Sequence, residues 1–195
     1  MTDWGELYRE HVTAVSALGA DLTEGQLATV VPATPAWTVH DVLAHMAGCG
    51  SDAVTGRMDG APAPEWTARH VNERAQLPVA DLVEELHTHQ DAVADSVADN
   101  PRPALVWNIA VHHADLHEAL GLARMPERLW LPIADAVSAR AGDQAAAVPP
   151  YELFRGSFSR RSRNQMLAWG TDLSAEGLDE LCLFGPREDD QPVPA

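Results

Sequence analysis

The stretch IAVHHADLHEAL, residues 109–120, places three of the chain's nine histidines beside Asp115 and Glu118. Imidazole is the commonest side-chain ligand for first-row transition metals, and it also exchanges protons near neutral pH. A second stretch, WTVHDVLAHM at residues 37–46, adds His40 and His45. These groups could hold a metal ion, act as acids and bases, or only occupy a helix surface. The outcome depends on which of them share a face.

Helical spacing separates the histidines of the first stretch into two groups. Residues three or four positions apart lie on one face of a helix. An apolar stripe includes one of them, and its members are Leu105, Ile109, His112, Leu116 and Leu120. Asn108 lies one turn before His112 on nearly the same side. We therefore predict that His112 points inward, whereas His113, His117 and Glu118 lie outward or at the boundary.

The second stretch has an apolar face of its own, made of Val42, His45, Met46 and Cys49. His45 is therefore predicted to point inward, while His40 and Asp41 belong to the start of the helix. Two inward histidines on different helices can converge, and bundle cores often hold metal ions between facing helices. A catalytic zinc site has three protein ligands and one open position. His45 and His112 supply two ligands, and spacing alone does not identify the third.

Each of these residues also has an ordinary structural interpretation. A buried histidine is more often a hydrogen-bonded core residue than a ligand. The pair His113 and His117, four positions apart, is typical of a solvated helix face. Cys49 could be a thiolate ligand, although a small buried hydrophobic residue is the favoured interpretation. Asp115 is placed to orient His112 or to cap a neighbouring element.

Four of the thirteen basic residues fall within nine positions, and they are Arg155, Arg160, Arg161 and Arg163. The guanidinium group pairs well with carboxylates, so Arg160 and Arg161 are candidates for binding the carboxylate of a substrate. Internal salt bridges to the acidic surface of the bundle are the favoured alternative.

The elements that must position these residues are helices. The residue pattern predicts four long ones, at about 3–20, from Val39, at 78–97 and at 104–121. The second begins after a recognisable start signal, with Thr38 as N-cap, Asp41 at the N3 position, and Trp37 and Val42 as a hydrophobic staple. Gly48 and Gly50 weaken its end, and residues 51–68 are expected to form a loop.

Beyond residue 121, weaker patterns predict a short helix from Pro132 and another over residues 151–169, with Gly156 inside it. Glu180–Phe184 is expected to form a short strand, followed by a polar, proline-rich end. The predicted fold is therefore mainly α. It is a four-helix bundle domain over residues 1–169, with a short C-terminal extension, residues 170–195, packed on it.

The amino-acid composition argues against some classes of binding partner. The chain has 195 residues, is 46% hydrophobic and carries a formal net charge of −16, which disfavours nucleic acid and anionic membranes as partners. No apolar run is long enough to cross a membrane, and the N-terminal residues do not resemble a signal peptide. Cys49 and Cys182 are therefore expected to be free thiols in a reducing cytoplasm. The lack of lysine is typical of a GC-rich genome, for which an actinobacterium is the natural candidate.

Four segments resemble, in order, segments of the mycothiol-dependent maleylpyruvate isomerase family within the DinB-like four-helix-bundle superfamily: TPAWTVHDVLAHMAG (34–48), VHHADLHEALG (111–121), FRGSFSRRSRNQMLAW (154–169) and LFGPRE (183–188). The resemblance implies a DinB-like bundle that binds a divalent metal, most often zinc, through three inward residues. By position these are His45, Asn108 and His112. Asn108 departs from the family's pattern, which has an acid or a histidine there, and an amide oxygen is a weak zinc ligand.

From these residues and this resemblance we expect a metal-dependent, mycothiol-linked isomerase or thiol transferase. Its substrate would be a small electrophilic carboxylate met by Arg160 or Arg161, with zinc as the metal and mycothiol as the thiol cosubstrate. No catalytic residue is assigned, and a homodimer is a candidate assembly. The alternative is a metal-free bundle that binds a small molecule or a partner protein without catalysis. In that case His45, Asn108 and His112 form an internal hydrogen-bonded cluster.

Overall fold

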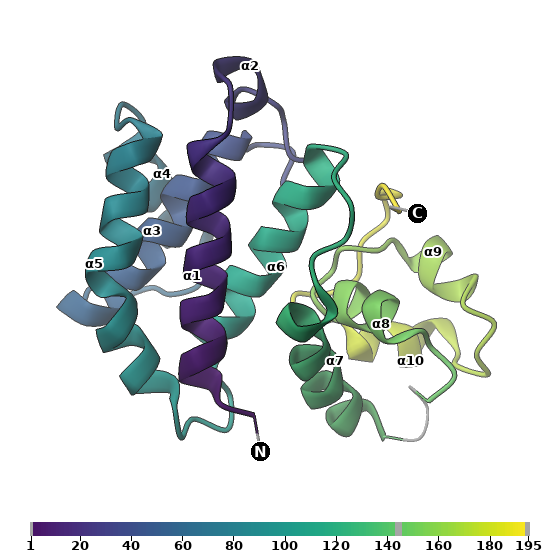
Figure 1. Cartoon of the computed structure of the whole chain (residues 1–195). Coiled ribbons are helices and arrows are strands. Elements are labelled where there is room, and N and C mark those ends of the chain that lie inside the picture. Colours follow the sequence, from purple (N-terminus) through teal and green to yellow (C-terminus); the bar gives the residue numbers. More distant parts are fainter. Residues whose placement is uncertain (1, 143–145, 194–195) are drawn as a thin grey trace. The chain divides into compact units, whose positions relative to one another are not determined.

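The computed structural model describes residues 2–142 and 146–193. Within these residues the chain forms ten helices and no strand, as Figure 1 shows. Their bounds are α1 Trp4–Ala20, α2 Glu24–Leu27, α3 Val39–Thr55, α4 Pro64–Arg74, α5 Val79–Val97, α6 Ala104–Ala119, α7 Glu127–Ala141, α8 Pro150–Ser157, α9 Arg163–Leu167 and α10 Ala175–Leu181. The prediction of a mainly α fold is confirmed.

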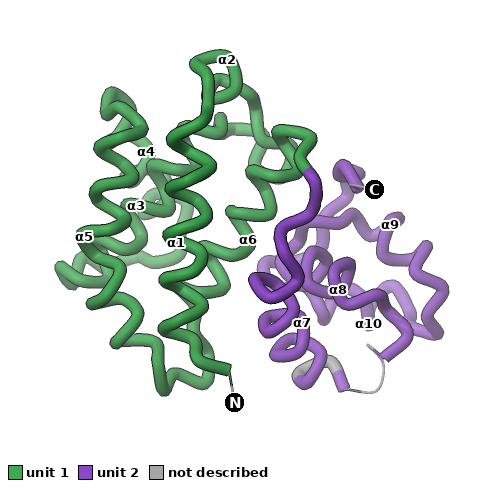
Figure 2. The backbone as a smooth tube through the Cα atoms, viewed as in Figure 1, with its two compact units in different colours: residues 1–122 green, residues 123–195 purple. Residues whose placement is uncertain are grey.

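The contacts of the chain group it into two compact units, Met1–Leu122 and Ala123–Ala195 (Figure 2). The division between them falls earlier than the domain boundary predicted at 169/170. It places α7, α8 and α9 in the same unit as the C-terminal residues. That residues 1–169 fold as one domain stays a prediction.

Four long helices of the first unit form a bundle. α1 packs against α5 and α6, and α3 packs against the same two helices, while the shorter α4 lies against α3. These four are the long helices that the residue pattern predicted. Their inner faces supply a fully buried apolar core that includes Val12, Val15, Val42, Leu43, Leu82 and Val106. The predicted bundle is therefore confirmed, and it is the part of the molecule that holds the inward histidines.

The start of α3 follows from local chemistry. Thr38 accepts a hydrogen bond from the backbone N–H of Asp41, and the Asp41 carboxylate accepts from the backbone N–H of Thr38. This capping box satisfies two backbone donors that a helix start leaves without partners. The prediction that a helix opens at Val39 is confirmed.

The end of α3 differs from the prediction. The helix continues through Gly48 and Gly50 and ends at Gly56, which has a φ of 75° in the left-handed region that favours glycine. The two inner glycines serve packing, because their missing side chains let other elements approach. The predicted loop over residues 51–68 is accordingly too long, since α3 fills its beginning and α4 starts at Pro64.

The second unit corrects two further predictions. The single helix predicted over residues 151–169 is two helices, α8 and α9, because Ser159 adopts a φ of 59° and Ser162 caps a new start. Gly156 allows the chain to fold back here, since a Cβ would lie 2.4 Å from the Trp169 ring. The helix predicted from Pro132 is present as α7, but it begins earlier and has Pro132 inside it.

The strand predicted at Glu180–Phe184 is wrong. Ser174 caps the start of α10, and this helix occupies the first part of the predicted strand. Leu178 and Cys182 are buried against Met166 in a small apolar cluster. A short apolar run suits a helix as well as a strand when only one side is covered. The other expectation for these residues holds, because Cys182 is a free thiol, like Cys49.

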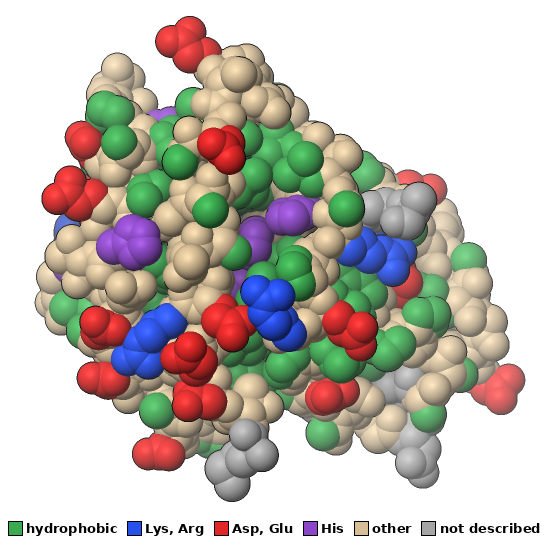
Figure 3. Space-filling view, in the orientation of Figure 1, with side chains coloured by type: hydrophobic (Ala, Val, Ile, Leu, Met, Phe, Trp, Pro, Cys, Tyr) green, Lys and Arg blue, Asp and Glu red, His purple; other side chains and the backbone are tan. Residues whose placement is uncertain are grey.

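Acidic side chains are scattered over the face drawn in Figure 3, with fewer basic ones among them. This distribution agrees with the net charge of −16. None of the helices in the described part of the chain combines the length and the apolar character that a membrane crossing requires.

Candidate metal centre

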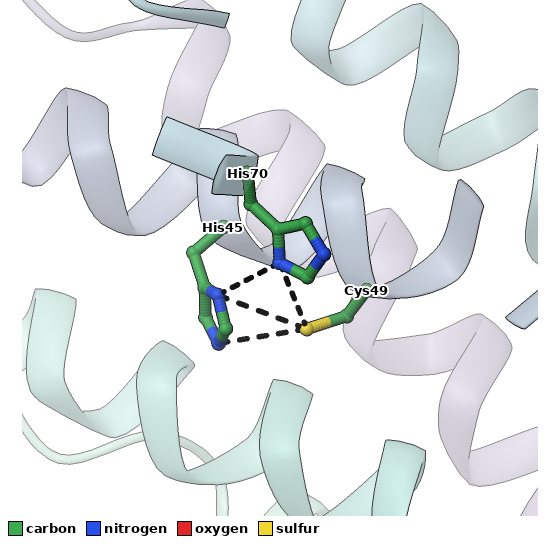
Figure 4. Close-up of side chains that lie close together, drawn as sticks. All are labelled: His45, Cys49 and His70. Carbon is green, nitrogen blue, oxygen red and sulfur yellow. Dashed lines mark hydrogen bonds between the residues drawn. The ribbon is translucent and has the colours of Figure 1, made fainter. Parts of the chain in front are cut away.

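Three buried side chains from α3 and α4 meet inside the first unit. His45 and Cys49 lie one turn apart on α3, and His70 comes from α4. Their exposed fractions are 2%, 3% and 0%. Figure 4 shows the two imidazole rings and the thiol directed toward one another. Within residues 2–142 and 146–193, this is the one cluster of three or more His, Cys, Asp or Glu side chains close enough to share a metal ion.

The distances between the donor atoms suit a tetrahedral metal ion. The Nδ1 atoms of His45 and His70 are 3.2 Å apart, and Sγ of Cys49 lies 3.8 Å from the first and 3.9 Å from the second. Around tetrahedral zinc, nitrogen ligands at about 2.0–2.1 Å and sulfur at about 2.3 Å stand about 3.3 Å (N to N) and about 3.6 Å (N to S) apart. The observed separations agree to within about 0.3 Å. The donor set therefore fits a zinc-like ion, for which it supplies three of the four ligands of a tetrahedral site.

Asp52 orients the ring of His70. Nε2 of His70 lies 2.8 Å from Oδ2 of Asp52, and the guanidinium of Arg69 donates to both carboxylate oxygens. Burial raises the pKa of Asp52, but the hydrogen bonds from Arg69 and His70 outweigh it and hold the pKa below its ordinary value. An ionised carboxylate only accepts hydrogen bonds, so His70 donates from Nε2. Its Nδ1 then carries the lone pair that faces His45 and Cys49.

The charge state of the metal-free centre follows from its burial. Burial lowers the pKa of His70, and this outweighs the opposite effect of Asp52. Burial also raises the pKa of the Cys49 thiol far above its ordinary value. At neutral pH His70 is therefore neutral and Cys49 is protonated. A metal ion that binds here must displace the thiol proton.

Gly48 gives His70 its place against α3. A Cβ at position 48 would lie 2.5 Å from Cγ of His70, which is far inside van der Waals contact. Trp66, one turn earlier on α4, packs edge-on against the same ring with the centroids 4.2 Å apart. Residues 45, 48, 49 and 52 follow the i, i+3, i+4, i+7 spacing of one helix face. A single stripe of α3 therefore surrounds the histidine from α4.

The three ligands predicted from the sequence also lie close together. Nδ2 of Asn108 is 3.3 Å from Nε2 of His45, and the rings of His45 and His112 have centroids 5.0 Å apart. Oδ2 of Asp115 lies 3.0 Å from Nδ1 of the His112 ring, and a role for Asp115 in orienting that ring stays a prediction. The prediction that Asn108 and His112 ligate a metal stays a prediction, while His45 belongs to both arrangements.

The hydrogen bonds of the centre run in one order, from Asn108 through His45 and His70 to Asp52. Asn108 donates to Nε2 of His45, so the proton of that ring sits on Nδ1 and points to Nδ1 of His70. His70 in turn donates from Nε2 to Asp52. Each neutral ring thus donates once and accepts once along the chain Asn108, His45, His70, Asp52. Metal binding at Nδ1 of His45 requires this ring to move its proton to Nε2, where residue 108 must then accept it.

His70 and Asp52 were missed by the sequence reasoning, because residues 51–68 were expected to form a loop. The sequence does contain a pattern typical of a helix start in this region, but the pattern is short. Pro64 is a good first residue for a helix, and Trp66 and His70 follow with one-turn spacing. Recognising α4 would have placed His70 on a helix face together with an aromatic residue.

The outward placement of His113 is wrong. Its exposed fraction is 2%, and its Nδ1 lies 3.1 Å from Nδ1 of His11 on α1. Burial, followed by the neighbouring His11 and His117, lowers the pKa of His113 well below its ordinary value. His117 is half-buried, as a boundary position would be, with its ring centroid 4.9 Å from that of His113.

Arg161 and Arg163 make salt bridges, as the favoured alternative expected, but with acidic side chains of the second unit and not of the bundle. Both ends of the Arg161 guanidinium pair with Glu152, at 2.7 and 3.1 Å. Arg163 pairs with Asp179 and Glu188. Arg160 donates from Nη1 to the backbone carbonyl of residue 158. The assignment of Arg160 and Arg161 to a substrate carboxylate stays a prediction.

One comparison with known proteins gives a match. A family model described as the mycothiol maleylpyruvate isomerase N-terminal domain covers residues 8–129, a range that includes α1 to α6 in nearly full length and every residue of the candidate centre. No curated protein and no solved structure gives a significant match.

Proposed function

The chain belongs to the mycothiol maleylpyruvate isomerase N-terminal domain family, and on that premise we propose that it is a metal-dependent isomerase or thiol transferase that uses mycothiol. Its substrate is a small electrophilic molecule that bears a carboxylate, as the maleylpyruvate of the family's description does. Zinc is the proposed metal, because two imidazoles and one thiolate match its ligand preferences. His45, Cys49 and His70 are the proposed ligands.

The spacing of the three donors carries the metal assignment. The side chains are buried, they converge from two helices, and their donor atoms stand 3.2 to 3.9 Å apart. Hydrogen bonds between the rings and the thiol allow such separations too, but the convergence of three donors of this kind on one point is what a shared metal ion requires. When bound, the metal supplies a Lewis acid that polarises a carbonyl or stabilises a thiolate.

The protein's own groups orient the donors and keep water away. Asp52 and Asn108 bind the outer nitrogens of the two histidines. The rings of Trp37 and Trp66 have centroids 4.9 and 6.2 Å from that of His45. These aromatic faces line the centre with apolar surface, and a site of low polarity strengthens the interaction of charges within it.

Arg160 and Arg161 stay the proposed partners of the substrate's carboxylate. A guanidinium group binds a carboxylate through two parallel hydrogen bonds. Arg161 makes such a pair with Glu152, and Arg160 donates to the backbone carbonyl of residue 158. An Arg160→Gln variant is expected to raise KM for maleylpyruvate about tenfold, which is the loss of about 1.4 kcal/mol of binding, with kcat little changed. An unchanged KM would remove Arg160 from the proposal.

Elemental analysis by inductively coupled plasma mass spectrometry, on protein purified without an affinity tag, tests the metal first. About one zinc ion per chain is expected in the wild type, and far less in His70→Ala and Cys49→Ala variants. Matched Asn108→Ala and His112→Ala variants show whether those residues contribute ligands. Turnover of maleylpyruvate with mycothiol is then compared with and without zinc, and activity that requires both is expected. A protein that takes up no zinc contradicts the proposal.

One observation favours a second candidate function. The hydrogen-bond chain from Asn108 to Asp52 satisfies the two rings without a metal, as a metal-free bundle that binds a small molecule or a partner protein would require. Thermal unfolding with and without added zinc separates the two. A metal that binds only the native state stabilises it by about 2.7 kcal/mol at a hundredfold excess over Kd. Identical unfolding curves support the metal-free function.

A further inference from the structure

Asp52 lies on α3 one turn after Cys49 and is 1% exposed. We propose that Asp52 is a positioning residue for metal binding, which holds His70 in the tautomer whose Nδ1 is unprotonated and able to ligate. The inference rests on the proposed function, because it assumes a metal ion held by His45, Cys49 and His70.

The tautomer of His70 decides whether the centre can form. A neutral imidazole carries its proton on one nitrogen, and only the other nitrogen can bind a metal. In His70 the nitrogen that faces the other two donors is Nδ1, 3.2 Å from Nδ1 of His45. The carboxylate of Asp52 accepts from Nε2 at 2.8 Å, which keeps the proton on the far side of the ring. Metal-ligating histidines commonly have such a carboxylate partner, which also makes the ligand more basic.

Asp52 is itself held in place from α4. Arg69, the residue before His70, donates to both oxygens of the carboxylate, and Nε of Arg57 lies 3.9 Å from Oδ1. One helix therefore supplies both the ring and the guanidinium group that fix the same carboxylate. With both oxygens engaged, the carboxylate cannot turn away from His70.

Gly48 adds an independent reason to assign this role to the α3 stripe. It brings the ring of His70 so close to the backbone that a Cβ would lie 2.5 Å from Cγ. A salt bridge between Asp52 and Arg69 needs no such approach by a histidine. The glycine places the ring and the carboxylate orients it, so both serve the position of one nitrogen.

The first test leaves Asp52 unchanged and reads the tautomer of His70 directly. Long-range 1H–15N correlation spectra of the metal-free wild type report which nitrogen of each histidine carries the proton, with His70 assigned by comparison with His70→Ala. We expect the Nε2–H tautomer for His70. The Nδ1–H tautomer, or a mixture with a large Nδ1–H fraction, would overturn the proposal.

The second test measures cobalt(II) and zinc affinity of Asp52→Asn by competition with a chelator of known affinity, using the absorption bands of the thiolate-bound cobalt as the signal. An asparagine amide can donate to Nε2 and move the proton of His70 to Nδ1. We expect the affinity to fall about 10- to 100-fold. The matched control is Glu85→Gln, which removes the partner of Arg74, one turn after His70 on the same helix. The control should lower stability and leave the affinity unchanged.

The outcomes separate this inference from the function on which it rests. A wild type that binds neither cobalt nor zinc removes the proposed function and, with it, the role of Asp52. A wild type that binds while Asp52→Asn binds within about twofold leaves the function standing and overturns only the positioning role. A loss of affinity that Glu85→Gln shares equally also overturns it, because general loosening of α4 would then be the cause.

Discussion

A Gly48→Ala substitution is expected to disable the candidate centre without changing any donor atom. The new methyl group would lie 2.5, 2.6 and 2.7 Å from Cγ, Cβ and Cδ2 of His70. Ordinary contacts between carbon atoms are about 3.5–4.0 Å, so the ring has to move by about 1 Å. It cannot simply rotate, because Asp52 holds Nε2 and Trp66 packs against the ring. α4 must therefore shift away from α3.

The expected effects on folding and on metal binding differ in size. Overpacking of this kind lowers the free energy of unfolding by about 1–3 kcal/mol. Replacing glycine by alanine inside a helix raises it by about 1 kcal/mol. The variant should thus fold with a net loss of about 0–2 kcal/mol. Metal–ligand bond lengths stay within about 0.2 Å of their standard values. A shift of about 1 Å removes His70 as a ligand, and zinc affinity should fall by more than about 100-fold, beyond the loss of an outer-shell partner.

Urea unfolding of the metal-free protein and chelator competition for zinc measure the two effects separately. Gly50→Ala is the matched control, since it makes the same change on the same helix. The three atoms nearest to a Cβ there are Oη of Tyr8 at 3.3 Å and two carbon atoms at 3.9 Å, so the hydroxyl has to give way by only a few tenths of an ångström. We expect its zinc affinity to equal that of the wild type. If Gly48→Ala binds zinc as tightly as Gly50→Ala, the reasoning about His70 is refuted.

Three further changes test neighbouring groups. Asn108→Asp should raise zinc affinity by about 10- to 100-fold, because a carboxylate accepts the Nε2 proton of His45 and leaves Nδ1 to ligate; equal or weaker binding in chelator competition would contradict this. Zinc binding should release one proton from Cys49 near neutral pH, because burial raises the pKa of that thiol, and uptake without acidification of a weakly buffered solution with an indicator dye would argue against thiolate ligation. Glu85→Gln should lower the free energy of unfolding by about 2–3 kcal/mol at pH 7, because buried Arg74 loses its nearer charged partner and keeps the more distant Glu73. Burial raises the pKa of Glu85, but the hydrogen bond and charge of Arg74, together with Ser51 and His89, lower it by more, so the stabilisation exists above the ordinary pKa near 4.5 and disappears as the pH falls through the lowered value. The difference between the variant and the wild type in urea unfolding should therefore shrink as the pH falls below the ordinary pKa of Glu85, and a constant difference would show that ionisation of Glu85 is not its origin.

The start of α3 could be predicted from the sequence, and its end could not. Thr38 and Asp41 cap the helix through atoms within three residues of each other, so the start could be predicted. Gly48 was expected to weaken the end, but its role comes from His70, which lies on another helix. The break between α8 and α9, at Ser159, could not be predicted from such local rules. It depends on contacts distant in the sequence, such as the approach of the Trp169 ring to Gly156.

The burial of some histidines and of Cys49 in the bundle could be predicted from the sequence, and that of His113 could not. His45 was placed inward correctly, and Cys49 was recognised both as a buried residue and as an alternative ligand. His113 was placed outward because the predicted apolar stripe was taken to be the whole buried face. α6 is buried more widely than that, and His11 on α1 meets His113 there.

Local interactions were enough to define the long helices, their starts and the inward direction of His45, because capping and apolar spacing act within one or two turns. They were not enough to say which donors would meet that histidine. A helix face indicates the direction of the core, but the residue across the gap depends on how closely two helices approach and at what register. Here a glycine without a Cβ and a buried carboxylate bring His70 to His45 and Cys49, and only the packed structure contains that approach.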